Sequence, residues 1–597
     1  MAILAACAMA LPAAALAQGQ ASTDWGYSGG PASDHYSALT QITAANVANL
    51  QEAWRFPMDL GGLESQPTKI GDTVYAPVVN GNLVALDAKT GQPRWTFKPD
   101  VKGFQPVRGI ATWMDGKKLR LLLGRESFLF MVDAETGKPV TSFGDGGKID
   151  IRENLRGKKE DNAIYITSPA VVYQNLIITS GRLAENTPAS PGDLRAWDAR
   201  TGKLVWTFHT IPHPGEVGAD TWPKDAYLTQ GGANAWNGAS VDVARGVVLI
   251  NTGSPADDFY GAKRIGDNRF ANSTIALDAK TGKRLWDFQQ VHHDLWDSDS
   301  TSPPVLTTIT RGGKKVDAAV AWNKAAYVYV LDRATGKPVF PIPEVAVPPS
   351  NVPGEVASKT QPIPSLPHPL TKKSITVDDL TTRSPEANAA ARELFAKLHG
   401  AGQPYVPVGL NQNTLVIPGF GGGWGGGAAD RNGVLYVSAG NGAGMTSMVD
   451  NTKIRERIGE PGAPLPPGGL QNGYAHLDYN FSGYGQFRLP DGPALNEAAT
   501  ASTLNAIDLN TGQYRWTVPL PNRVPGSGPL VTATGLLFIV AGDKLQSYGT
   551  ADGKLIAEQK LPGLTGTSPG TYMQDGKQYV VVASGGRGAA YVAYTLK

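Results

Sequence analysis

The feature that most constrains the fold is a short repeat that returns along nearly the whole chain. Its fullest copies place an Asp, a Thr-Gly pair and a Trp at one spacing, in Leu83–Trp95, Leu194–Trp206, Ile275–Trp286 and Leu504–Trp516. Shorter copies are Phe130–Gly137, Tyr329–Gly336 and Leu545–Gly553. In each copy a strand-like run ends near Asp, Gly takes a positive φ in the turn, and a second run follows. This pattern predicts a repeated β-hairpin.

A further β run precedes each hairpin, such as Thr73–Ala76 or Val247–Ile250. Four short strands in each repeated unit predict an all-β fold, a β-propeller in which every unit is one blade. Seven turns are visible, and Gly433–Ser438 supplies one more β unit, so we expect eight blades, with seven as the alternative. The high counts of Gly (71) and Pro (44) agree with a turn-rich chain. The recurring Trp is expected to pack between blades.

Two segments interrupt the repeats. The first, about 341–410, begins with the Pro- and Ser-rich run Pro341–Pro369 and continues into a helical-looking piece around Pro385–His399. The second, about 451–495, is rich in Gly and Pro. We expect both to be insertions on one face of the propeller, where they could cover a site on its axis.

The first 17 residues have the pattern of a secretory signal peptide, with a short apolar run and the small-residue cleavage pattern Ala15-Leu16-Ala17. This predicts a periplasmic protein whose propeller domain spans residues 18–597. Cys7, the only cysteine, lies inside the signal. The processed chain would therefore have no disulfide, no thiolate zinc site and no Cys-x-x-Cys-His haem attachment, which argues against a fused haem domain.

Composition and charge exclude two further classes of protein. The formal net charge is +2, and Lys and Arg are scattered singly instead of forming a basic stripe, so we expect no nucleic-acid partner. No later segment is long and apolar enough to predict a transmembrane span.

Acidic side chains concentrate in residues 285–300. His292 and His293 are followed by Asp294, Asp297 and Asp299 within eight residues. Carboxylates this close repel each other unless a cation or a shared proton intervenes. On an extended strand Asp297 and Asp299 would face the same side. Taken alone, the stretch could also be a polar loop with a capped turn.

The repeats, the His-His-Asp-Leu-Trp-Asp motif at 292–297 and Gly-Gly-x-Trp424-Gly-Gly together resemble the pyrroloquinoline quinone (PQQ)-dependent dehydrogenases. The resemblance runs from about Trp25 to Leu596 and is greatest to soluble relatives of the propeller domain of membrane glucose dehydrogenase. It implies oxidation of an alcohol (a sugar, a cyclic polyol or a bulky secondary alcohol) to the carbonyl. It also implies PQQ, a metal ion and a separate electron acceptor, cytochrome c or the quinone pool.

The resemblance assigns cofactor-binding roles to Glu64, Arg108, Thr167, Ser168, Gly181, Arg182, Trp236, Lys324 and Trp424. The forked guanidinium of Arg108 suits the carboxylates of PQQ, and the indole of Trp236 would be the floor under its ring. Without the resemblance, Arg108 and Thr167 could be ordinary strand-end residues, and Trp236 a core aromatic. Many alcohol-oxidising members cover PQQ with a disulfide between adjacent cysteines, which this chain cannot form.

For the reaction itself, Asp297 matches the catalytic carboxylate, with Asp294 as second choice, and Lys324 matches a cation beside the quinone oxygens. Glu185, Ser254, Asp297 and Asp299 are the expected metal ligands. Their oxygen atoms suit calcium. An additional carboxylate from Asp299 would also suit a trivalent lanthanide ion, the alternative metal, although Asp299 could instead cap a turn.

A different class of protein stays open at this point, a cofactor-free propeller that scaffolds the assembly of envelope proteins. Such a scaffold has no need to keep Arg108, Trp236, Asp297 and Lys324 together.

Overall fold

The computed structural model describes residues 23–26, 29–30, 32–61, 64–185, 187–400, 403–416, 421–451, 477–483, 485–520, 526–564 and 566–597. The expected signal peptide at 1–17 lies outside these residues, and so do residues 452–476 of the second expected insertion.

Antiparallel sheets follow one another along the described chain, as the repeats predict. The first two contain β3 (Thr68–Ile70), β4 (Thr73–Pro77), β5 (Leu83–Asp87) and β6 (Pro93–Phe97), then β7 (Ala111–Asp115), β8 (Lys118–Arg125), β9 (Phe128–Asp133) and β10 (Lys148–Asp150). The next two contain β12 (Val171–Tyr173), β13 (Leu176–Thr179), β15 (Leu194–Asp198) and β16 (Leu204–Phe208), then β17 (Ala239–Asp242), β18 (Val247–Asn251), β19 (Ser273–Asp278) and β20 (Arg284–Gln289).

The second half of the chain continues the series. A three-stranded sheet has β21 (Val305–Arg311), β22 (Lys314–Trp322) and β23 (Val328–Asp332). After it come β27 (Ala428–Ala429), β28 (Val434–Gly440), β35 (Ser502–Asp508) and β36 (Gln513–Leu520), then β37 (Leu530–Thr532), β38 (Leu536–Ala541), β39 (Lys544–Gly549) and β40 (Leu555–Lys560). The last sheet has β41 (Gly570–Gln574), β42 (Lys577–Ser584) and β43 (Ala590–Thr595).

The N-terminal part of the described chain joins the C-terminal sheets. β1 (Tyr36–Ser37) pairs in parallel with β37, and β2 (Gln51–Pro57) pairs antiparallel with β43. These pairings join the first strands of the described chain to its last two sheets.

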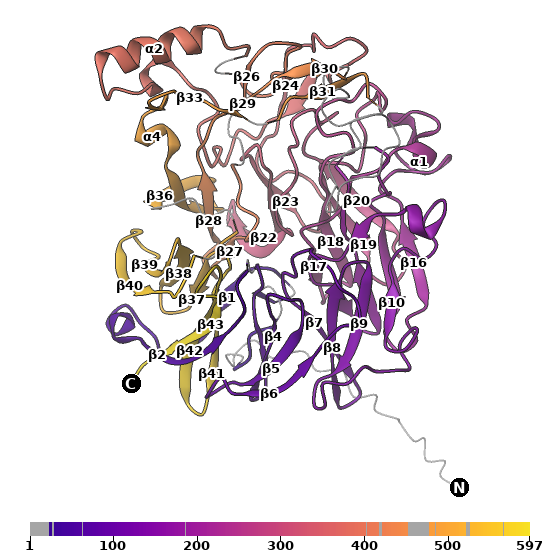
Figure 1. Ribbon diagram of the computed structural model, residues 1–597, viewed down its shortest axis with the longest axis vertical. Coiled ribbons are helices and arrows are strands. Elements are labelled where there is room, and N and C mark those ends of the chain that lie inside the picture. The colour runs from indigo at the N-terminus through magenta and orange to yellow at the C-terminus, as the bar shows by residue number, and fades with distance from the viewer. Residues whose placement is uncertain are drawn as a thin grey trace.

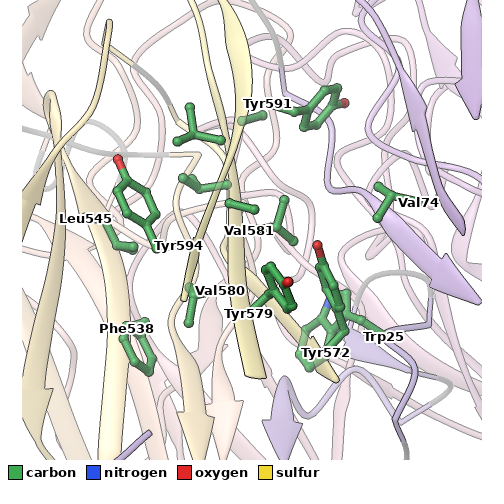
Figure 2. Close-up of a cluster of buried hydrophobic side chains, with 14 of the residues drawn as sticks. Trp25, Val74, Phe538, Leu545, Tyr572, Tyr579, Val580, Val581, Tyr591 and Tyr594 are labelled. Carbon is green, nitrogen blue, oxygen red and sulfur yellow. The ribbon is translucent and has the colours of Figure 1, made fainter. Parts of the chain in front are cut away.

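Apolar clusters lie between consecutive sheets. One cluster joins the first sheet to the second, and similar clusters join each sheet to the next along the series. The largest returns to the beginning, because it contains Val74 of the first sheet, Phe538 of the seventh and Tyr591 of the last (Figure 2). The fold is a β-propeller, as expected. Counting each of these sheets as one blade agrees with the expected eight, and that count stays an interpretation because the sheets contain three to five strands.

The repeat residues explain why neighbouring sheets dock. The indole Nε1 of Trp286 donates to the carbonyl of Arg333 in the turn of the next sheet at 3.0 Å. Gly336 in that turn has a φ of 71°, and a Cβ placed on it would lie 2.5 Å from the Trp286 ring. The same pairing of an indole with a following turn recurs at Trp54, Trp95, Trp206 and Trp516. The Trp of the repeat is therefore a docking residue between sheets, as the sequence predicts.

Most of the remaining elements lie in the two segments that interrupt the repeats or next to them in the chain. Figure 1 shows them gathered at one end of the molecule, beyond β22 and β23. They are β24 (Glu344–Ala346), β25 (Thr360–Pro362), α2 (Pro385–Ala396), β26 (Thr414–Val416), β29 (Gly444–Thr446), β30 (Met448–Asp450), β31 (Tyr479–Phe481), β32 (Gly485–Gln486), β33 (Arg488–Leu489), β34 (Gly492–Pro493) and α4 (Glu497–Thr500).

The helical prediction around Pro385–His399 is confirmed by α2. Ser384 caps this helix by accepting a hydrogen bond from the Ala387 amide, and Pro385 occupies its first turn. The other short elements are β11 (Ile164–Tyr165), β14 (Arg182–Leu183) and α1 (Ala226–Thr229). Within the described ranges, no helix has the length and apolar character needed to cross a membrane.

Candidate active site

The aspartates of the acidic stretch lie in the loop between β20 and β21, and this loop meets Lys324, which follows β22. The Lys324 ammonium lies 2.5 Å from Oδ1 of Asp297 and 2.8 Å from Oδ2 of Asp299. The three side chains are mostly buried, with 17% of Lys324 and 14% of each aspartate exposed. Asp297 has a φ of 54°, a conformation that the surrounding contacts must hold in place.

The charges in this cluster do not balance. Burial raises the pKa of Asp297 well above its usual range, and Asp299 and Glu185 raise it further, while Lys324 acts in the opposite direction. Burial by itself would lower the pKa of Lys324, but the two aspartates outweigh burial and hold that pKa well above its usual value. The cluster therefore contains a proton-accepting carboxylate beside a cation that stays charged.

Asp299 connects this ion cluster to the predicted cofactor floor. Its Oδ2 accepts a hydrogen bond from the indole of Trp236 at 3.2 Å, and its Oδ1 accepts from the backbone amide of Ser254 at 2.6 Å. A Cβ on Gly253 would lie 2.3 Å from Oδ1, so glycine is what allows this approach. The donors come from distant parts of the chain, and Asp299 is therefore not a local turn cap.

Asp294 has a different environment from its two neighbours. Its carboxylate accepts from the hydroxyl of Ser254, from the side-chain amide of Asn272 at 2.9 Å and from the backbone amides of Trp296 and Ser298 at 3.0 and 2.8 Å. Burial is the main cause that raises its pKa. With its oxygens occupied by these donors, Asp294 organises the loop, and Asp297 is the aspartate better placed to act as a base.

A carboxylate that the sequence reasoning missed completes the cluster. Asp258 is buried, and its pKa is raised well above the usual range by burial and then by Asp297, Glu185 and Asp299. Its loop is tied to the Glu185 segment, because the neighbouring Asp257 accepts hydrogen bonds from the amide and hydroxyl of Thr187. The consecutive aspartates after Thr252-Gly-Ser-Pro255 were the only signal in the sequence.

The predicted metal ligands lie near each other but are not assembled around one point. Among the described residues, no three His, Cys, Asp or Glu side chains form a group that could hold a metal ion as they stand. Lys324 bridges Asp297 and Asp299, and the hydroxyl of Ser254 turns toward Asp294. Even so, several carboxylates share a single ammonium here. The chemistry of these donors fits a hard, oxygen-seeking cation.

Arg108 lies over the Trp236 ring. Its guanidinium carbon lies 5.5 Å from the centre of that ring, and Nη2 lies 2.8 Å from Glu64. Its Nε and Nη1 are buried and find no acceptor among the described residues. Burial lowers the pKa of Arg108, and the nearby charge of Arg182 lowers it further. A ligand with several carboxylates would satisfy these N–H groups and relieve the repulsion.

Further predicted cofactor residues surround the same region. Glu64, Arg108, Ser168 and Trp424 line one cavity with an empty volume of about 670 Å³. The buried Thr167 hydroxyl and Trp424 indole N–H find no partner among the described residues. The hydroxyl of Ser168 donates to the carbonyl of Trp236 at 2.7 Å, so it positions the floor residue. The Thr167 hydroxyl and the Trp424 indole N–H, which have no partner among the described residues, fit an oxygen-rich planar ligand.

Gly181 and Arg182 lie at the start of β14, beside β11. The carbonyl of Gly181 accepts from the side chain of Asn234 at 2.7 Å, and a Cβ on Gly181 would lie 2.6 Å from Ile164. Arg182 contacts Glu185 at 3.4 Å. Gly181 is thus required by close packing, whereas Arg182 brings positive charge toward Arg108.

A chain of contacts joins the separate predictions. Arg108 lies over Trp236, Trp236 donates to Asp299, and Asp299 shares Lys324 with Asp297. The cofactor residues and the reacting residues therefore form one site, although they come from four separate loops of the chain.

Comparisons with known proteins identify the family of the chain. Residues 25–580 match the family described as "Glucose/ethanol/alcohol dehydrogenase, beta-propeller domain". The chain is 30% identical to the quinoprotein glucose dehydrogenase of Escherichia coli, over 95% of this chain and 77% of that protein. It is 28% identical to the quinate/shikimate dehydrogenase (quinone) of Acinetobacter baylyi, over 98% and 80%. The chain belongs to the PQQ-dependent dehydrogenases.

Within this family, the fold is shared with the quinohemoprotein alcohol dehydrogenase of Comamonas testosteroni. The two structures superpose with a TM-score of 0.72 at 22% identity, over 96% of this chain and 80% of the other. The resemblance drawn from the repeats and motifs is confirmed, and so is the class of enzyme, a quinoprotein dehydrogenase that acts on CH–OH groups. The residue roles remain predictions, now with a geometry.

Proposed function

We propose that this PQQ-dependent dehydrogenase oxidises a sugar, a cyclic polyol or a bulky secondary alcohol to the carbonyl in the periplasm. The observation that carries the proposal is the cluster of Asp297, Asp299 and Lys324 hydrogen-bonded to the indole of Trp236. Bound PQQ would accept the hydride of the alcohol, which carries both electrons of the oxidation. Arg108, Thr167 and Trp424 hold it through the buried donors that lack partners among the described residues.

Asp297 removes the hydroxyl proton of the alcohol. Its raised pKa makes it a stronger base than an exposed aspartate, and a base is most effective when its pKa approaches the working pH. Lys324 keeps its charge beside it and stabilises negative charge that develops on substrate oxygen. Asp299 holds the side chains of Lys324 and Trp236 in fixed positions relative to each other, because its carboxylate contacts both.

The proposed metal ion is calcium, held by carboxylate oxygens of Glu185, Asp297 and Asp299, with a lanthanide as the alternative. The surplus of carboxylates over the single Lys324 ammonium supports a cation here. The export signal expected at residues 1–17 supports the periplasmic location, and we propose a separate acceptor, cytochrome c or the quinone pool, for the electrons.

The test is reconstitution of the purified protein with PQQ and calcium, followed by dye reduction with a panel of sugars, cyclic polyols and secondary alcohols. We expect substrate-dependent dye reduction that requires PQQ. A protein that binds PQQ but oxidises none of the three substrate classes would contradict the proposal.

A further inference from the structure

One carboxylate of the first insertion reaches into the propeller beside the acidic cluster. Glu355 is almost fully buried, with 2% of its side chain exposed. Its Oε1 lies 2.7 Å from Nε2 of His293, and its Oε2 accepts a hydrogen bond from the backbone amide of Gly261. His293 precedes Asp294 in the loop between β20 and β21, whereas Gly261 lies in the loop between β18 and β19. Glu355 therefore contacts two loops of the propeller at once.

The contact between Glu355 and His293 is a buried ion pair. Burial would raise the pKa of Glu355, but His293 and Arg264 outweigh burial and hold that pKa below its usual value. Nδ1 of His293 lies 2.7 Å from the carbonyl oxygen of Gly266, so this nitrogen must donate. Because Nε2 faces an ionised carboxylate, both ring nitrogens carry a proton and the ring is positively charged. Removal of either partner would leave a buried charge without compensation.

A buried guanidinium joins the same two loops a second time. Nη2 of Arg264 donates to the carbonyl oxygen of Asp257 at 2.8 Å and also to the carbonyl oxygen of Asp294. The insertion is fixed at this place by a further hydrogen bond, because the hydroxyl of Tyr260 donates to the carbonyl oxygen of Pro353 at 3.0 Å. The insertion and the two loops are therefore held together at one place.

The same two loops carry carboxylates that repel each other. Asp258 belongs to the first loop, and Asp297 and Asp299 belong to the second. After burial itself, Asp297 is the largest cause that raises the pKa of Asp258, so repulsion acts between the loops. Asp297 also has a φ of 54°, a conformation that its surroundings must impose. Contacts outside the acidic cluster are therefore needed to keep its carboxylates close together.

We propose that Glu355 is a positioning residue for the oxidation: by bridging His293 and Gly261 it holds Asp297 where that carboxylate can accept the hydroxyl proton. Glu355 acts through the two loops and is not itself a catalytic residue. The inference rests on the proposed role of Asp297 as the base. It gives the first insertion a part in the reaction beyond covering the site.

The experiment replaces Glu355 by Gln in the holoenzyme. Gln has the same length, but its amide has a single oxygen and can accept fully from only one of the two loops. We expect kcat for dye reduction to fall by about tenfold or more, because a misplacement of about 1 Å can cost about a hundredfold. KM and the Kd for PQQ should change by less than about threefold, since binding does not depend on the base. Hydrogen exchange of the backbone amides at 292–299 should become faster.

Glu355→Asp keeps the charge beside His293 but is one methylene shorter, so we expect a smaller loss of kcat. Asp242→Asn is the matched control, because Asp242 is a buried carboxylate that pairs with Arg245 and Arg333 in two turns. It should lower the temperature of thermal unfolding and leave both kcat and the exchange at 292–299 unchanged.

The inference is overturned if Glu355→Gln and Glu355→Asp both keep the wild-type kcat, or if Asp242→Asn loses kcat to the same extent, since reduced stability alone would then explain the loss. A wild-type protein that oxidises no alcohol would instead contradict the proposed function. In that case the exchange measurement still decides the role of Glu355, because unchanged exchange at 292–299 in Glu355→Gln would show that this carboxylate does not hold the loop.

Discussion

Replacing Arg108 by Met tests whether the buried guanidinium holds PQQ. In the structure one of its nitrogens faces Glu64, and two other N–H groups, at Nε and Nη1, are buried without an acceptor among the described residues. A ligand that accepts from both would make two charge-assisted hydrogen bonds, worth about 1.5–3 kcal/mol each. Their loss weakens PQQ binding by about 3–6 kcal/mol, or roughly a hundredfold to ten-thousandfold in Kd.

The assay is titration of PQQ-free protein with PQQ, followed by quenching of tryptophan fluorescence. Trp236 and Trp424 both belong to the site, so bound PQQ should quench them. Arg108→Lys keeps the charge but loses the fork, and we expect an intermediate loss. Glu64→Gln combined with Arg108→Met separates the lost contacts from the cost of leaving Glu64 unpaired.

Arg94→Met is the control, because Arg94 forms ion pairs with Asp72 and Asp87 on the outer part of the first sheet. It should bind PQQ as the wild type does. A Kd for Arg108→Met within about threefold of the wild type would refute the reasoning, because the loss of two charge-assisted hydrogen bonds costs more binding free energy than that.

Three further outcomes are expected. Asp297→Asn removes the base, so turnover falls by about a hundredfold or more while PQQ still binds, and near-normal dye reduction would move the role to another carboxylate. Stripping the metal and restoring calcium, magnesium or lanthanum separately should recover activity with calcium; recovery with lanthanum alone would overturn that choice, and full recovery by calcium in Asp299→Ala would show that this carboxylate is not needed. Gly336→Ala forces a Cβ into the Trp286 ring at a φ of 71°, so thermal unfolding should show at least about 1 kcal/mol of destabilisation, and an unchanged Tm would contradict the docking role.

The fold could be predicted because its information is local. The fuller copies of the repeat contain their own turn chemistry, with Asp capping the turn and Gly at positive φ, as Asp278 and Gly282 illustrate. The Trp that follows, such as Trp286, then reaches the identical turn of the next sheet. A residue pattern that repeats its local geometry and its neighbour contact together leaves few alternatives to a ring of sheets.

The site was only partly predictable because its last members meet through loops of unrelated sequence. Asp258 reaches the acidic cluster because Asp257 is tied to Thr187 and Ser254 to Asp294, and no spacing along the chain encodes those contacts.

The three aspartates of the acidic loop show most directly what sequence leaves undecided. Asp294, Asp297 and Asp299 are the same residue type within six positions, and motif spacing alone could not separate their roles. Hydrogen-bond donors separate them in the folded chain. Amide groups and the hydroxyl of Ser254 donate to Asp294, which therefore has a structural role. An indole and a distant backbone amide donate to Asp299, which connects the two parts of the site. Asp297 faces the ammonium of Lys324 in a strained backbone conformation. Because a base must keep an accessible lone pair while its neighbours fix its position, the division of donors assigns the chemistry to Asp297 and its support to the other two.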